Sequence, residues 1–138
     1  MSKPRQSLAQ DLAWRFEAFG YDLFVGLMRL LGVDAASAFG GWLLKTVGPL
    51  TGAHKTARRN LRLAFPEKDD TWHEAMLAAQ WENVGRLSAE FPLMDKLVPS
   101  TGRVELINGE RLAEIRASGV PVVFVSGHLS NWEVMPAA

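Results

Sequence analysis

A continuous apolar run near the end of the chain limits the folds that are open to it. Residues 121–125 read Pro-Val-Val-Phe-Val and contain no polar side chain. Such a run is typical of a β-strand that is covered on both faces, as strands of a parallel sheet are. The run therefore predicts a sheet with helices on both sides.

The residues before this run predict the rest of a βαβ unit. Val104 and Leu106 alternate with charged residues, as in a half-buried strand. A short helix is expected over residues 110–117, with Gly119 as the left-handed residue that ends it. Strand, helix and strand in succession make a right-handed crossover. The predicted fold class is α/β: a helical N-terminal arm leads into a parallel αβα sheet, which is incomplete in this chain.

The first ninety or so residues predict helices, because apolar residues recur at helical spacing and are interrupted by glycine, proline and polar residues. The predicted segments are residues 12–33, 34–50, 53–65 and 71–91. Thr71 and Glu74 form a capping box that is expected to begin the last of them. Pro92 is expected to end or kink it.

The first predicted helix is apolar on most of its circumference. On a helical wheel, an arc of about 40° holds its main charges, Asp11, Arg15, Asp22 and Arg29. These charges argue against a membrane-spanning helix and against a secretory signal. Two interpretations stay open: a helix buried in a large core, or a helix lying in a membrane interface with Trp14 as an anchor.

Composition excludes some kinds of chemistry. The chain has no cysteine and 3 scattered histidines, so thiolate catalysis is excluded and a metal site is not expected. Lys and Arg total 15, as do Asp and Glu. This balance argues neither for nor against an anionic partner.

A histidine and a carboxylate follow the apolar run directly. Gly127 ends the run, His128 is next, and Glu133 lies five positions further on. A carboxylate on one imidazole nitrogen fixes the tautomer and leaves the other nitrogen free to take a proton from a hydroxyl. On one helix the pair would be about 140° apart, so we expect His128 in a loop and a helix beginning near Asn131. The residues alone leave open a histidine at a strand end that is satisfied by a carbonyl.

Basic residues repeat at helical spacing in the third predicted helix. They lie at i, i+3, i+4 and i+7 and are predicted to project from one face: Lys55, Arg58, Arg59 and Arg62. This basic face is either a solvated surface or a contact for anionic lipid head groups or a phosphorylated glycolipid. Nucleic acid is not expected, because no aromatic residues interleave with the basic ones.

Three blocks of the sequence resemble one enzyme family. Residues 127–133, GHLSNWE, resemble the H-x4-D/E motif of the lysophospholipid acyltransferase superfamily, in the form common in bacterial lipid A biosynthesis acyltransferases. Residues 59–67, RNLRLAFPE, and the segment 83–90, with Asn-Val-Gly-Arg followed by Glu90, are similar to upstream blocks of that family. Ser130 differs from the glycine of many members, and serine is modestly unfavourable there if the position needs a positive φ.

The resemblance implies an O-acyltransferase of the lauroyl or myristoyl type. A fatty acyl chain would pass from acyl carrier protein, or acyl-CoA, to a hydroxyl of a Kdo-bearing lipid A precursor at the cytoplasmic face of the inner membrane, with no cofactor besides the acyl donor. By position, His128 would be the general base and Glu133 its partner. Gly127, Asn131 and Trp132 would shape the turn.

Members of that family are considerably longer, so the resemblance implies that the chain is their N-terminal half. Residues 1–52 would be a membrane-associating helical arm, and residues 53–138 the N-terminal part of the catalytic domain. The chain by itself is then expected to be inactive.

Two alternative functions stay open. A related acyltransferase with a glycerophosphate or mannoside acceptor would keep the motif and change the lipid. A truncated, non-catalytic membrane-surface fragment is the alternative from a different class of protein.

Overall fold

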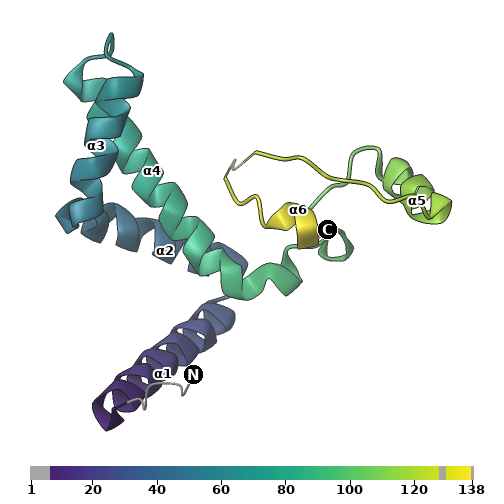
Figure 1. Cartoon of the computed structure of the whole chain (residues 1–138), viewed down its shortest axis with the longest axis horizontal. Coiled ribbons are helices and arrows are strands. Elements are labelled where there is room, and N and C mark those ends of the chain that lie inside the picture. The colour runs from purple at the N-terminus through teal and green to yellow at the C-terminus, as the bar shows by residue number, and fades with distance from the viewer. Residues whose placement is uncertain (1–6, 128–129, 138) are drawn as a thin grey trace, which may run out of the picture.

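The computed structural model describes residues 7–127 and 130–137, which form helices joined by irregular segments. The α-helices are α1 (Leu8–Leu31), α2 (Val33–Val47), α3 (Gly52–Ala64), α4 (Asp70–Glu90), α5 (Gly109–Ser118) and α6 (Val134–Ala137). Short 3-10 helices are η1 (Gly48–Leu50), η2 (Phe91–Lys96) and η3 (Pro99–Thr101). In Figure 1, α4 crosses α2 and meets α3, while α1 extends away from them.

The predicted parallel αβα sheet is wrong, because the described residues contain no strand. Residues 121–125 are irregular, and the side chains of Val123 and Val125 are 89% and 93% exposed. The segment around Val104 and Leu106 is irregular as well. A strand exists only through hydrogen bonds to a neighbouring strand. The apolar run has the composition of a strand, but no described segment pairs with it.

The helical predictions are confirmed, with shifts at their ends. The expected capping box at Thr71 is wrong, because α4 begins earlier. Asp69 is its N-cap, and its carboxylate accepts a hydrogen bond from the backbone N–H of Trp72 at 2.7 Å. Aspartate is among the strongest N-cap residues, so it takes precedence over the threonine two positions later. Gly119 ends α5 with a φ of 64°, as predicted.

The helices α2 and α4 cross in close contact, and glycines face each other at the crossing. A Cβ atom added to Gly40 would overlap the carbonyl oxygen of Gly85, and one added to Gly85 would overlap that of Gly40. Ala36 and Ala89 are fully buried beside this crossing. The small residues let the two backbones approach until they touch, which fixes α2 on α4.

The helix α1 is attached to the rest of the protein at its C-terminal end. Met28 is fully buried against η2, where it packs with Leu93. Arg29 donates two hydrogen bonds to the carboxylate of Asp95, at 2.9 and 3.0 Å, and a third to the carbonyl of Pro92. The hydrogen bond from Arg29 lowers the pKa of Asp95. These contacts fix the point from which α1 projects.

Elsewhere α1 exposes its apolar side chains. Those that are at least two-fifths exposed include Leu8, Leu12, Trp14, Phe16, Phe19, Tyr21, Leu23, Leu27 and Leu30. No helix in the described ranges is both long enough and apolar enough to span a membrane. The predicted division of the chain into a helical arm and a catalytic domain at residue 52 stays a prediction. The helix α2 packs more extensively on α4 than on α1.

Candidate active site

The H-x4-E motif leads into α6 through a short turn. His128, the predicted general base, lies outside the described residues, whereas Glu133 is half-buried immediately before α6. The N–H of Val134 donates to the carbonyl of Asn131 at 3.2 Å, and the N–H of Met135 donates to that of Trp132 at 3.1 Å. These bonds close a turn over residues 131–135. The helix begins at Val134, three residues after the position near Asn131 that the sequence predicted.

The backbone of this turn has a left-handed residue. Ser130 has a φ of 50°, a conformation that favours glycine and costs other residues free energy. The concern that serine would be unfavourable here is therefore justified. Gly127 is exposed just before the motif, and Trp132 is half-buried within the turn.

Two neighbouring residues of the turn are hydrogen-bonded to α4. The side-chain amide of Asn131 donates to Oε2 of Glu90 at 2.7 Å, and the hydroxyl of Ser130 is 3.3 Å from Oδ1 of Asn83. Asn83 and Glu90 are seven positions apart and lie on one face of α4. The structure thus brings together two segments that the sequence analysis treated separately: residues 83–90 on α4 and the H-x4-E motif.

Glu90 also connects the turn to α2. Its other carboxylate oxygen, Oε1, accepts a hydrogen bond from the hydroxyl of Ser37 at 2.7 Å. Arg86 donates to the same hydroxyl at 3.3 Å and pairs with Glu82 at 2.7 Å. The hydrogen bond from Arg86, followed by that from Lys45, lowers the pKa of Glu82. A polar network therefore joins α2, α4 and the turn.

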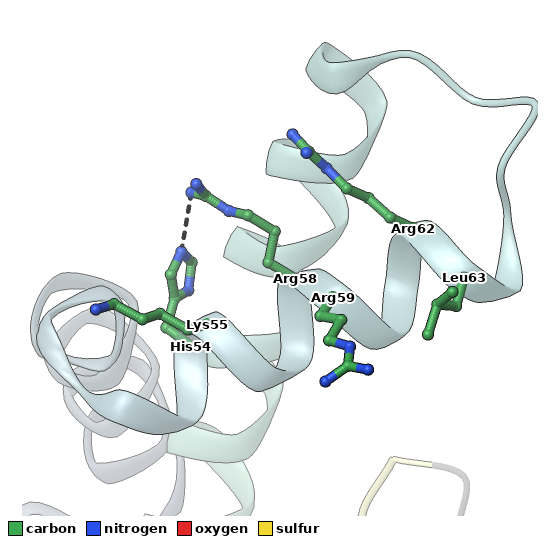
Figure 2. Close-up of a pocket in the computed structure, with 6 residues that line it drawn as sticks. All are labelled: His54, Lys55, Arg58, Arg59, Arg62 and Leu63. Atoms are coloured by element: carbon green, nitrogen blue, oxygen red, sulfur yellow. Dashed lines mark hydrogen bonds between the residues drawn. The ribbon is translucent and has the colours of Figure 1, made fainter.

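The basic face on α3 borders an open pocket of about 380 Å³. Figure 2 shows the residues that line it: His54, Lys55, Arg58, Arg59, Arg62 and Leu63. Arg58 and Arg62 extend to one side and Arg59 to another.

Half of the basic face is neutralised by acidic residues. Arg58 pairs with Glu74 at 3.0 Å and Arg62 with Asp70 at 2.7 Å. Within the described ranges, neither Lys55 nor Arg59 has an ion pair. The sequence predicted one face of four equivalent cations, because it could not show which acidic residues of α4 lie opposite. Lys55 and Arg59 carry the charge that is available to an anionic partner.

His54 is a member of this pocket that the sequence did not single out. It is only 9% exposed, and its Nδ1 accepts a hydrogen bond from the indole of Trp81 at 3.0 Å. Its Nε2 is 3.1 Å from a guanidinium nitrogen of Arg58, the same nitrogen that pairs with Glu74. The sequence feature that could have indicated this contact is the spacing of His54 and Arg58, which are one helical turn apart.

The other predicted membrane contact, Trp14, lies on α1. Trp14 is 46% exposed, and its predicted role as an interfacial anchor stays a prediction. In the part of the chain that the structure describes, no three His, Asp or Glu side chains are close enough together to hold a metal ion.

The chain matches one protein-family model, described as bacterial lipid A biosynthesis acyltransferase, over residues 11–137. The match spans the basic face, the network on α4 and the H-x4-E motif. Among curated proteins and solved structures, none matches the chain.

Proposed function

The chain belongs to the bacterial lipid A biosynthesis acyltransferase family and is an acyltransferase; from that premise, we propose that it acylates a hydroxyl of a Kdo-bearing lipid A precursor. The donor is a fatty acyl thioester, on acyl carrier protein or on coenzyme A. The family match carries the proposal, because it covers residues 11–137 and includes the motif that supplies a base and a carboxylate. No cofactor besides the donor is invoked.

The proposed reaction is a direct transfer. His128 takes the proton of the acceptor hydroxyl as the oxygen attacks the thioester carbonyl, so that a C–O bond forms and a tetrahedral oxyanion results. The oxyanion collapses, the C–S bond breaks, and the leaving thiolate takes the proton from the imidazolium. Glu133 orients the imidazole and stabilises its positive charge. The half-buried position of Glu133 supports this role, because partial exclusion of water strengthens the interaction between opposite charges.

We assign membrane attachment to two surfaces. The exposed apolar side chains of α1, including Trp14, suit a helix that lies in the lipid interface. Lys55 and Arg59, which have no acidic partner among the described residues, suit anionic head groups. Together they would hold the enzyme at the cytoplasmic face of the inner membrane, where its glycolipid acceptor is accessible.

Mass spectrometry of the reaction product tests the proposed function. Because this chain by itself is expected to be inactive, the intact protein that contains it is purified and incubated with an acyl thioester and a Kdo-bearing lipid A precursor. The expected product is heavier by one acyl group. Parallel incubations with a glycerophosphate and with a mannoside acceptor should give no product. Acylation of either of these in place of the lipid A precursor would identify the related acyltransferase, and no transfer to any acceptor would favour the non-catalytic alternative.

Charge reversal of Lys55 and Arg59 should release the protein from anionic membranes. A basic residue near such a surface contributes about 1 kcal/mol, so loss of two alone should lower the partition coefficient about 30-fold, and the two added carboxylates should lower it further. Co-sedimentation with vesicles that contain anionic phospholipid measures this for Lys55→Glu/Arg59→Glu.

The matched control for that variant is Arg111→Glu/Arg116→Glu, which makes the same change of net charge on α5. This control should partition within a few-fold of the wild type, because α5 carries no part of the basic face. Equal partitioning of the two double variants would remove the basic face from the proposal and leave α1 as the attachment.

A further inference from the structure

The turn that carries Glu133 is held on α4 by one short, charge-assisted hydrogen bond. Glu90 accepts it from the amide of Asn131 at 2.7 Å, and hydrogen bonds to an ionised acceptor are about twice as strong as neutral ones. The second contact, between Ser130 and Asn83, is longer, at 3.3 Å, and joins two neutral groups. Of these two contacts, the one to Glu90 is the stronger restraint.

Asn131 has no other side-chain partner among the described residues. Its Oδ1 atom is buried and makes no hydrogen bond with a described residue. An unsatisfied buried oxygen costs free energy. The hydrogen bond to Glu90 is therefore the side-chain contact that orients this amide among the described residues.

Glu90 itself is held in place from α2. The hydroxyl of Ser37, on a residue only 9% exposed, donates to Oε1 of Glu90 at 2.7 Å, and Arg86 lies behind that hydroxyl. The carboxylate is thus bound on both oxygens, one by α2 and one by the turn. This is how a supporting residue restrains a loop: its own orientation is fixed by the packed helices.

We propose that Glu90 is a positioning residue that sets the placement of Glu133 through Asn131. This role rests on the proposed function, in which Glu133 acts on His128. Asn131 is two residues before Glu133, and the turn between them is closed by the bond from Val134 to the carbonyl of Asn131. A displacement of about 1 Å at a reacting group can lower a rate about 100-fold. Loss of the Glu90 contact should therefore lower kcat more than it changes KM.

Exchange of the carboxylate at position 90 with the amide at position 131 tests this role. Glu90→Gln keeps the shape but has one acceptor oxygen for two donors, Ser37 and Asn131, so one contact is lost, and kcat should fall about 10- to 100-fold with little change in KM. Glu90→Gln/Asn131→Asp restores one amide facing one carboxylate with their positions exchanged, and should recover most of the lost kcat. Glu114→Gln makes the same charge change on α5, away from the turn, and should keep the wild-type kcat.

Two outcomes would overturn the proposal: a wild-type kcat in Glu90→Gln, or no recovery in the double variant at an unchanged melting temperature. If Glu90→Gln does not fold, Asn131→Ala removes the contact from the side of the turn and leaves the bond between Ser37 and Glu90 intact. It should lower kcat to a similar extent, and a wild-type kcat in Asn131→Ala would equally overturn the proposal.

Hydrogen exchange separates failure of this proposal from failure of the proposed function. In Glu90→Gln, the amides of Val134 and Met135 should exchange faster than in the wild type, while those of α1 should not change, whether or not the protein transfers acyl groups. Unchanged exchange at these two amides would overturn the positioning role. A wild-type protein without transferase activity would overturn the proposed function alone.

Discussion

Gly85→Ala should destabilise the protein by about 2–3 kcal/mol, the usual cost of overpacking in a closely packed interior. The added Cβ would overlap the carbonyl oxygen of Gly40, and this oxygen belongs to helix backbone that cannot move without shifting α2. Alanine stabilises a helix by about 1 kcal/mol relative to glycine. This gain offsets part of the cost of the overlap, and the measured change in the free energy of unfolding is the difference between the two. Urea denaturation followed by circular dichroism gives the free energy of unfolding.

The matched control for Gly85→Ala is Gly26→Ala in α1, where an added Cβ would have no atom within 4 Å. This variant should be as stable as the wild type or up to about 1 kcal/mol more stable. Equal stabilities for Gly85→Ala and Gly26→Ala would contradict the close crossing of α2 and α4. A shift of α4 relative to α2 should also separate Ser37 from Glu90, so Gly85→Ala is expected to lose activity in its folded fraction.

The sequence predicted the helices well because helical signals are local. The apolar repeat of the third predicted helix and Pro66 after it fall within a few residues of one another, and α3 ends at Ala64 as they indicate. The left-handed Gly119 followed from the same kind of short-range argument. The error at the start of α4 was local too, since two acceptable N-caps compete within three residues and Asp69 is the stronger.

The predicted sheet failed because a sheet depends on partners far away in the sequence. Residues 121–125 have the composition of a buried strand, but composition does not say which segment pairs with them. The contact between Gly40 and Gly85 was missed for the same reason. Each glycine looks like a weak point in a helix until the other is placed against it.

The site shows the same division between local and distant information. A positive φ at Ser130 was considered because many members of the resembled family have glycine at that position, and the structure has a φ of 50° there. The basic spacing on α3 was visible, but Glu74 and Asp70, which neutralise two of the four residues, were not assigned to it. The contact of Glu90 with Asn131 spans 41 positions and could not be read from spacing.

His128→Ala should lower the rate of acyl transfer by about 1,000-fold or more, because general base catalysis contributes about 100- to 10,000-fold and no second base is proposed. Glu133→Gln keeps the shape of the side chain, removes its charge, and should lower the rate about 100-fold or more. Melting temperatures should stay close to that of the wild type, since Glu133 makes no ion pair with a described residue.

Two control variants accompany these changes. Glu114→Gln removes a carboxylate from α5 and should leave the rate unchanged. His73→Gln removes an imidazole that is bonded to the carbonyl of Phe65, far along α4 from the turn. It should lower stability, while the rate per folded molecule stays near that of the wild type.

The single-turnover rate of acyl transfer by His128→Ala, with enzyme in excess over the acyl thioester, tests the central claim most directly. This measurement separates the chemical step from product release. Acyl transfer by a folded His128→Ala protein should be about 1,000-fold slower than by the wild type. A rate within about tenfold of the wild type would show that another group takes the proton and would contradict the assignment of the H-x4-E motif as the catalytic centre.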